Sequence, residues 1–491
     1  MPPLPPLLTG RALPRYFLRQ VPTDFSEALV DAATAIVDGS GEPDDIDVSR
    51  RLDLTNLISL AIDEESTQEV DDAVAVEALP EDEGGGVRLW VHVADPTRYV
   101  PIGSQLEVEA RRRGSSIYLP TGTIPMFPMS LAKGPLSLVQ GKASCALSLG
   151  VMLDPTGAID RSRPAVITPS LVSVRRLTYG QVDGLLHDTL ANADGADDVD
   201  VEVSDAELSS LRSLDALSLE RRDYRVEAGS MERIAPGGLP DMSIKAGRAT
   251  ESPDGWEVSV RTGGARAGGA ARRIVTELML IAGEAAAQYG MENAVPLPFR
   301  GQTYREILSD EEIADCPEGP CRAWLGIRQM NSGTISESPT AHEGLGLDAY
   351  VQVTSPIRRY ADLAVHYQLK AHMRGDALPF PADDAAEVAS ASVRSAAGLL
   401  NLARSSGTLA RSLERQQNDY WLREWLKRGA GKSMRALVLG SSFDRRKSEM
   451  LSYRLLLEDF GAIVDCKSSE PLNLGAVIDC APDRLGDIIV R

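Results

Sequence analysis

The chain has 491 residues, 25% of them charged, and its formal net charge at pH 7 is −20. This length exceeds one simple core, so we expect two or three domains, one of them large. The acidic balance disfavours nonspecific binding of nucleic acid to the outer surface, although a groove lined locally by arginine can still hold single-stranded RNA. Five cysteines without a CxxC pair argue against a disulfide framework and against a zinc site.

The N-terminal sequence carries no evident targeting signal. Residues 1–25 lack the charged start and apolar core of a secretory signal, and their richness in proline without serine disfavours a transit peptide. No apolar run reaches the about 18 residues that cross a membrane. We therefore expect a protein without membrane association, cytoplasmic or, in a eukaryote, in the stroma or matrix of an organelle.

After a proline-rich start, the first predicted elements are a helix and two strands. The helix is expected near residues 25–36, and the polar linker SGEPDDIDVS follows it. Apolar runs at residues 58–62 and 73–79 indicate two buried strands. The intervening segment, IDEESTQEVDDA at residues 62–73, is therefore predicted to be an acidic loop between them.

The acidic loop places four carboxylates within ten residues: Asp63, Glu69, Asp71 and Asp72. A strand, loop, strand arrangement can fold such side chains back onto one point. Carboxylate oxygens are the ligands that Mg²⁺ and Mn²⁺ prefer, and these ions serve phosphoryl chemistry. The alternative is a solvated acidic loop without a chemical role, because loops readily collect acidic residues.

Two helices are predicted in the second half of the chain. Residues 183–207 form an acidic connection before them. The first helix is expected from Arg272 to about Tyr289, and Glu277 borders its apolar stripe, where a structural hydrogen bond is the simplest role. The second is expected to begin at Ser355, in the segment SPIRRY, and to run to about Met373.

The start of this second helix has features of a phosphate site. Helix N-termini attract phosphate, and Arg358 in the first turn would add a forked donor for two phosphate oxygens. Arg359 can instead pair with Asp362. His366, four residues after Asp362, can also bond to it. His92 has alternating neighbours on a predicted strand, which favours a structural histidine over a general base.

Several arginines are candidates for lining an RNA groove, and each can equally be a solvated surface residue. They are Arg111, Arg112, Arg113, Arg272, Arg273, Arg300, Arg358 and Arg359. From Arg435 onward the pattern changes to short strand-like runs separated by turn residues. These runs predict a small five-stranded barrel of the S1 or OB type, either binding single-stranded RNA or only packing on the preceding domain.

Several motifs in chain order carry a family resemblance. Beside the acidic loop they are VRLWVHVADPTRYV from Val87, YLPTGTIPMFP from Tyr118, RRIVTELM from Arg272 and YVQVTSPIRRYADLAVH from Tyr350. Together they resemble the RNB catalytic domain of the ribonuclease II and ribonuclease R exoribonucleases. Within this family the chain resembles most the cyanobacterial and organellar branch, in Glu69, EARRRGSS from Glu109, PFRGQ from Pro298 and AVHYQLKA from Ala364.

The resemblance implies an α+β fold, with a large mixed RNB-type catalytic domain followed by a small S1/OB-like β-barrel. The implied parts are a short extension at residues 1–51, the catalytic domain at residues 52–430 and an RNA-binding barrel at residues 431–491. Full-length relatives carry two cold-shock-type barrels ahead of the catalytic domain, and residues 1–51 cannot hold them. We therefore expect those barrels to be missing and duplex RNA to be entered poorly.

The resemblance also implies a hydrolytic 3′ to 5′ exoribonuclease, acting as a monomer, that degrades or trims single-stranded RNA to nucleoside 5′-monophosphates by two-metal catalysis. Mg²⁺, or Mn²⁺, would be bound by Asp63, Glu69, Asp71 and Asp72, with Asp71, Asp72 and Arg358 as catalytic residues. Contacts with RNA would come from Tyr118, Tyr179, Glu277, Arg300 and Arg359.

Two other functions stay open. One is a catalytically degenerate RNB-fold RNA-binding regulator, which would tolerate the loss of Asp72. The other is a deoxyribonuclease with similar metals, which single-stranded DNA as substrate would reveal. The sequence also leaves open which RNAs are substrates, which decay partners act with the chain and how Glu69, where many relatives have Asp, affects the rate.

Overall fold

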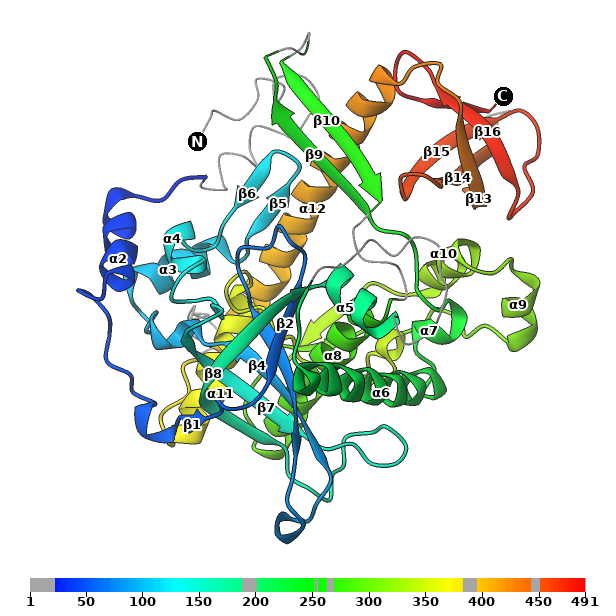
Figure 1. The fold of residues 1–491 in the computed structure, drawn as a ribbon. Helices are drawn as coiled ribbons and strands as arrows, with labels where there is room; N and C mark the ends of the chain where they lie inside the picture. The colour runs from blue at the N-terminus through cyan, green and yellow to red at the C-terminus, as the bar shows by residue number, and fades with distance from the viewer. Residues whose placement is uncertain are drawn as a thin grey trace.

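The computed structural model describes residues 23–490, except 188–200, 251, 253–254, 263–268, 383–394 and 443–450 (Figure 1). The proline-rich start and most of the acidic connection predicted at residues 183–207 lie outside this part. Among the described helices, none combines the length and the apolar character that crossing a bilayer requires.

A six-stranded sheet forms the centre of the larger part of the molecule, in the order β1-β8-β2-β3-β4-β7. The long strand β8 pairs antiparallel with β7 along its first half and parallel with β2 along its second half. The sheet therefore curls back on itself, and β2 and β3 are antiparallel neighbours. The bounds are β1 (Leu52–Asp53), β2 (Ser59–Asp63), β3 (Asp72–Ala78), β4 (Val87–Ala94), β7 (Ala143–Val151) and β8 (Val166–Thr178).

Apolar residues alternate along these strands between two cores. On β4, Leu89 and Val91 lie in one core and Trp90 in the other. A strand covered on both faces requires this pattern, because successive side chains point to opposite faces. The first core is covered by α5 (Tyr179–His187), α6 (Asp205–Glu227) and α8 (Ala270–Glu292), the second by α2 (Glu27–Val37), α3 (Gln105–Arg113) and α4 (Met129–Ala132), and α11 (Tyr360–Arg374) contributes to both.

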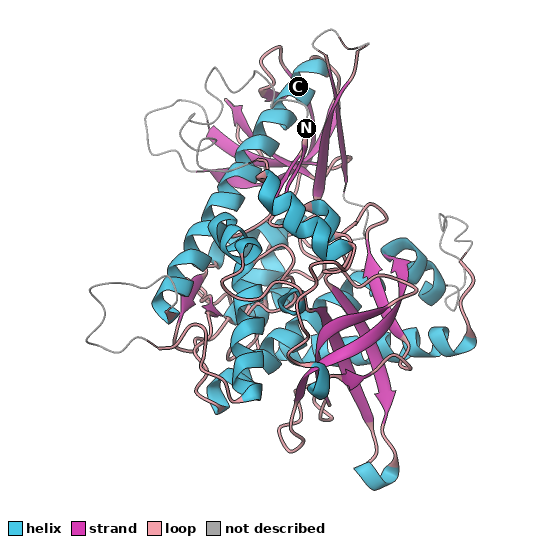
Figure 2. Ribbon diagram, turned by 90° about the vertical axis from the view of Figure 1, so that its left-hand side faces the viewer, coloured by secondary structure: helices cyan, strands magenta, loops and turns pink. Residues whose placement is uncertain are grey.

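The helix α12 (Ala396–Arg428) leads from this layered part toward the C-terminal barrel (Figures 1 and 2). Its 33 residues make it about 50 Å long. The barrel is closed, in the order β13-β14-β15-β17-β16, which confirms the predicted five-stranded barrel and the α+β class. Its strands are β13 (Met434–Ser442), β14 (Leu451–Leu457), β15 (Ala462–Ser468), β16 (Val477–Pro482) and β17 (Ile488–Val490).

A hairpin that the sequence analysis did not predict packs across α12 (Figure 1). It consists of β9 (Met242–Arg248) and β10 (Trp256–Thr262), and its apolar side chains share a core with α12 and the barrel. The shorter elements are β5 (Ile117–Leu119), β6 (Gly122–Ile124), α7 (Met231–Ile234), β11 (Phe299–Gly301), α9 (Asp310–Asp315), α10 (Pro320–Gln329), β12 (Thr334–Ser336) and four 3₁₀ turns, Val48–Arg50, Glu81–Glu83, Pro96–Arg98 and Glu343–Leu345.

Candidate active site

The four predicted carboxylates lie where β2 and β3 meet the loop between them. Asp63 is the last residue of β2, Asp72 is the first of β3, and Glu69 and Asp71 stand in the connection. The antiparallel pairing of the two strands brings both ends of the loop together. A cavity of about 620 Å³ opens at this point, and its lining includes Asp63, Glu69, Asp71, Asp72, Tyr118, Ser243, Lys245 and Arg358.

The acidic loop is fastened by hydrogen bonds to neighbouring segments. Arg176, on β8, donates through Nη2 to the carbonyl oxygens of Thr67 at 2.5 Å and of Glu64 at 3.1 Å. Ser137 Oγ accepts the N–H of Val70 at 2.7 Å. Sequence reasoning did not identify Arg176 or Ser137 as site residues, because a side chain that binds backbone atoms leaves no pattern in the sequence.

Burial raises the pKa of all four carboxyl groups. It raises the pKa of Asp63 to about 6 and that of Asp71 to about 7, while Arg358 opposes both shifts. The pKa of Asp72 is raised to about 8, because the charges of Asp63 and Asp71 add to the effect of burial. Burial also raises the pKa of Glu69. Burial and mutual repulsion thus outweigh the nearby cations, Arg176, Arg358 and Arg359, in setting the pKa values of the three aspartates.

Such a cluster fits a divalent cation in its chemistry. A cation would relieve both the cost of burial and the repulsion between the carboxylates, and oxygen donors suit Mg²⁺ and Mn²⁺. In the part of the chain that the structure describes, however, no three His, Cys, Asp or Glu side chains converge closely enough to form a ready-made ion site. Ion binding would therefore require these carboxylates to approach one another.

Arg358 faces the acidic loop from a turn and not from a helix. The predicted helix start at Ser355 is wrong, since α11 begins at Tyr360. Arg359 explains the difference, because its backbone is extended and forms an isolated bridge with Ser115, which interrupts the helical path before Tyr360. In the turn before it, Asp71 Oδ1 accepts the N–H of Ile357 at 3.1 Å, and Asp71 Oδ2 lies 3.3 Å from Arg358 Nε. Arg358 Nη2 also donates to Ser355 Oγ at 2.9 Å. Attraction of a phosphate here rests on the guanidinium and not on a helix N-terminus.

Two of the predicted aromatic contacts lie beside the carboxylates. Tyr118, on β5, lines the cavity with 43% of its surface exposed, and its hydroxyl donates to Glu69 Oε2 at 3.3 Å. Tyr179 is the first residue of α5. Burial raises its pKa to about 12, with further contributions from the charges of Asp63 and Asp72.

Arg359 and Arg300, both predicted to contact RNA, differ in their partners. Arg359 donates through Nε and Nη2 to Asp362 Oδ2, at 3.0 Å and 2.7 Å. Arg300, on β11, lies near the same Asp362, and burial and the charge of Arg359 lower its pKa. Within the described ranges no ion pair involves the guanidinium of Arg300. Arg359 is therefore largely neutralised, whereas Arg300 keeps its charge available.

The two candidate histidines have structural environments. His92 is fully buried on β4 with Nδ1 2.7 Å from Ser148 Oγ, and burial lowers its pKa to about 3. His366 Nε2 lies 2.9 Å from the carbonyl oxygen of Val353. The suggested bond between His366 and Asp362 is therefore not formed, and the histidine binds a backbone carbonyl instead.

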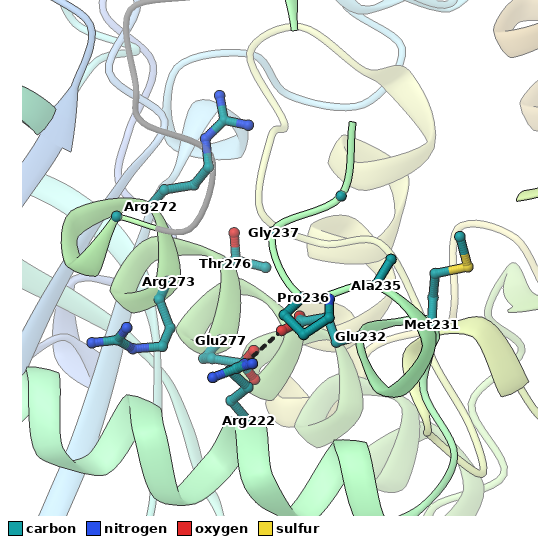
Figure 3. Close-up of a pocket in the computed structure, with 12 residues that line it drawn as sticks. Arg222, Met231, Glu232, Ala235, Pro236, Gly237, Arg272, Arg273, Thr276 and Glu277 are labelled. Atoms are coloured by element: carbon teal, nitrogen blue, oxygen red, sulfur yellow. Dashed lines mark hydrogen bonds and ion pairs between the residues drawn. The ribbon is translucent and has the colours of Figure 1, made fainter. Parts of the chain in front are cut away.

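A second cavity, of about 480 Å³, lies between α6, α7 and the start of α8 (Figure 3). Glu277 lines it, but only 1% of its surface is exposed, and Arg225 binds its carboxylate through Nε at 2.7 Å and also through Nη2. Arg272 extends away from Glu277 (Figure 3) and is paired with Asp241 at 2.7 Å. The predicted nucleotide contact of Glu277 therefore competes with an internal ion pair.

The remaining arginines considered for a groove are also paired with carboxylates. The pairs are Arg111 with Glu107, Arg112 and Arg113 with Glu109, and Arg273 with Asp215. Both glutamates stand on the same helix as their arginines, α3. These four side chains therefore support the local fold. Arg358, which lines the acidic cavity although it is paired with Asp71, and Arg300 are the better candidates for phosphate.

Comparison with known families now identifies the fold. A family model described as the RNB domain matches residues 51–375, about two thirds of the chain. The chain belongs to the RNB-domain family. Its acidic loop, β5 and the Arg358 turn all lie within the matched residues of this RNB-domain protein.

Two relatives support the predicted branch. An uncharacterized ribonuclease of Synechocystis is 37% identical over 464 residues, covering 94% of this chain and 62% of that protein. The chloroplastic and mitochondrial ribonuclease II of Arabidopsis thaliana is 35% identical over 436 residues, covering 88% and 49%. The resemblance to the cyanobacterial and organellar branch is therefore confirmed. The chain spans between about half and 62% of the length of these relatives.

Solved structures share the fold at lower identity. Mycoplasma genitalium RNase R, in complex with ribose-methylated single-stranded RNA, matches with a TM-score of 0.73 at 18% identity, covering 96% of this chain and 76% of that one. Yeast Ssd1, a pseudonuclease, matches with a TM-score of 0.60 at 18% identity, covering 91% and 54%. Because a ribonuclease and a pseudonuclease both match, the fold by itself does not decide whether the RNB domain is active.

Proposed function

We propose that this RNB-domain protein is a hydrolytic 3′ to 5′ exoribonuclease that degrades or trims single-stranded RNA to nucleoside 5′-monophosphates. The observation that carries the proposal is that four carboxylates, from β2, the loop and β3, line one cavity that Arg358 also lines. The names of the relatives, which are ribonucleases, agree with it. The 3′ to 5′ direction rests on the family resemblance.

The proposed chemistry divides between the carboxylates and their neighbours. Asp63, Glu69, Asp71 and Asp72 would hold two Mg²⁺ or Mn²⁺ ions, which supply activation of water and neutralisation of phosphate charge. The water oxygen joins the phosphorus while the bond from phosphorus to the 3′ oxygen breaks, so that the phosphate leaves on the 5′ carbon of the terminal nucleotide. Arg358 would hold the scissile phosphate through its forked N–H groups.

Other side chains would hold the RNA and not react with it. Tyr118 and Tyr179 would stack on bases, which is independent of sequence because every base has a π face. Arg300 would contact a phosphate, while Glu277 and Arg359 would have to be released in part from Arg225 and Asp362 to reach RNA.

The division of the chain follows the same proposal. Residues 1–51 are an extension, residues 52–430 are the catalytic domain, and residues 431–491 are an RNA-binding barrel that acts as a clamp at the mouth of the channel. A monomer in the cytoplasm, or in an organelle of a eukaryote, is the simplest state.

A linear RNA with a 5′ label tests the proposal. With Mg²⁺ the label should pass through a ladder to a short end product, and EDTA or the substitution Asp72→Asn should abolish the ladder. The matched control is Asp82→Asn, an exposed carboxylate on the turn between β3 and β4, which should leave the ladder intact. Intact RNA with the unaltered protein and Mg²⁺ would contradict the proposal.

The second candidate function is a regulator that binds RNA without cleaving it. It is favoured by the absence, within the described ranges, of three ion-binding side chains that already converge. A regulator should bind RNA equally well with and without the Asp72→Asn substitution and should release no nucleotide under any condition.

A further inference from the structure

The hairpin of β9 and β10 presents two different faces. On β9, Ile244 and Ala246 are buried in the core that the hairpin shares with α12 and the barrel. Between them in sequence, Ser243 and Lys245 are exposed, and both line the cavity of the acidic loop. Because successive side chains on a strand point to opposite faces, the polar face of β9 forms a wall of that cavity.

The strand register extends this polar wall to β10. Arg261 pairs directly with Ser243, and Ser259 pairs with Lys245. Directly opposite residues in an antiparallel pair share one face, so Arg261 and Ser259 lie on the same side as the two cavity-lining residues. The polar face therefore carries two cations and two hydroxyl groups, together with one carboxylate, Glu257, which pairs with Gly247 farther along the hairpin.

Lys245 and Arg261 form no ion pair with another described residue, whereas Arg272 and Arg273, a few residues further on, are both paired. No ion pair within the described ranges therefore accounts for the charge of Lys245 and Arg261. Unpaired cations beside small hydroxyl side chains along an extended strand suit the repeating phosphates of a nucleic-acid backbone.

The hairpin is also held firmly in place at both of its sides. The N–H of Ala246 donates to the carbonyl oxygen of Pro120 at 2.9 Å, which ties the hairpin to the turn that follows Tyr118. Thr262 Oγ1 donates to the carbonyl oxygen of Asp459 at 3.1 Å, in the barrel. The ring of Trp256 packs at a tilt against that of Trp421 on α12, with the ring centroids 5.0 Å apart. The wall thus has a fixed position between the cavity and the barrel.

We propose that Lys245 and Arg261, assisted by Ser243, bind the backbone phosphates of the RNA strand between the barrel and the acidic cavity. The inference rests on the proposed function in that the ligand is RNA, but it concerns binding and not cleavage. It assigns to the hairpin a positioning role: the strand is fixed at the cavity by charge, while the carboxylates receive its 3′ end.

RNA binding in EDTA tests the hairpin without any cleavage. The double variant Lys245→Gln with Arg261→Gln should bind a single-stranded RNA about tenfold more weakly at moderate salt, and the slope of log K against log[salt] should fall by about 1.4, because two phosphate contacts are lost. The charge-preserving variant Lys245→Arg with Arg261→Lys should keep the Kd and the slope. Arg212→Gln, an exposed arginine on α6, is the matched control and should change neither.

The outcomes separate this inference from the proposed function. If the double variant keeps the Kd and slope of the unaltered protein, or if the unaltered protein binds no RNA, the inference is overturned. If the unaltered protein binds RNA and the double variant binds it more weakly, the inference is supported, whether or not Mg²⁺ produces cleavage. Absence of cleavage with Mg²⁺ would contradict only the exonuclease proposal. Where cleavage occurs, the double variant should raise KM and leave kcat unchanged, as loss of uniform binding requires.

Discussion

Asp71 binds the Arg358 turn through both oxygens, accepting the Ile357 N–H at 3.1 Å while its second oxygen lies 3.3 Å from Arg358 Nε. The two segments are separated by 286 residues in sequence. One carboxylate therefore sets the place of the proposed phosphate donor and also belongs to the proposed metal site. A substitution of Asp71 would therefore disturb both the position of Arg358 and the proposed metal site.

Loss of the Arg358 fork should slow the reaction more than it weakens binding. We expect Arg358→Gln to lower kcat by about 10²–10³-fold, because a donor aimed at developing phosphate charge is removed. Arg358→Lys should recover little, since an ammonium cannot donate in two parallel directions. Steady-state cleavage measures both, with Arg212→Gln as control, and an unchanged kcat in Arg358→Gln would remove the residue from the mechanism.

Asp72 should reduce the stability of the metal-free protein at neutral pH. Its pKa rises from 3.8 to about 8 on folding, so between these values the native state holds more protons than the unfolded state and stability falls as pH rises. We expect Asp72→Asn to raise the free energy of unfolding in EDTA at pH 8 by about 1–3 kcal/mol, with a smaller gain near pH 5. Urea unfolding at the two pH values measures this, and a destabilised variant at pH 8 would contradict it.

Asp95 provides the opposite case. Burial alone would raise its pKa, but Lys370 and Arg51, at 2.6 Å and 3.1 Å, lower it below its ordinary value. Its contribution to stability is present above the unfolded pKa and is lost as pH falls through the folded one. Asp95→Asn should therefore cost about 3–5 kcal/mol at pH 7 because two buried cations lose a partner, and an Asp95→Asn protein as stable as Asp72→Asn would contradict this assignment.

The ring and the hydroxyl of Tyr118 should have separable effects. Tyr118→Ala is expected to weaken RNA binding in EDTA by about 1–3 kcal/mol, the range for one stacked base. Tyr118→Phe keeps the ring and loses only the hydrogen bond to Glu69, so its Kd should match that of the unaltered protein. Equal losses in the two variants would show that the hydroxyl, and not stacking, is the contact.

Glu277 should act first on stability. Glu277→Gln removes the buried carboxylate that pairs with Arg225. Because Arg225 keeps its ion pair with Glu232 at 2.8 Å, we expect a cost of about 1–3 kcal/mol. Replacing both residues by Met should restore most of this loss. If Glu277 also contacts the terminal nucleotide, as we propose, this double variant should leave a longer end product at normal stability, and an end product of unchanged length would limit Glu277 to its ion pair.

The sequence was sufficient to predict the elements whose pattern is local. Alternating apolar runs located β2 and β3 around the acidic loop, and short runs between turns located the barrel. The sequence analysis does not include the hairpin of β9 and β10, although apolar and polar residues alternate in both MSIKAGR and WEVSVRT. This pattern is local and is typical of strands. Lys245 was missed with the hairpin.

Contacts between distant segments could not be predicted. The helix α11 begins at Tyr360 and not at Ser355 because Arg359 is held in an extended conformation by a bridge to Ser115, which is far away in sequence. The pairing of Glu277 with Arg225 likewise depends on two helices packing together. Propensity at a single position cannot anticipate a tertiary partner that competes for the same N–H or carboxylate.

Release of the terminal nucleotide tests the central claim most directly. An RNA whose last nucleotide alone is labelled should be incubated with the protein and Mg²⁺, beside Asp72→Asn. We predict that the label is released at once as a nucleoside 5′-monophosphate by the unaltered protein and stays in the full-length RNA with the variant. Label that stays in full-length RNA with both proteins, or that appears in internal fragments, would contradict a 3′ to 5′ exonuclease built on these carboxylates.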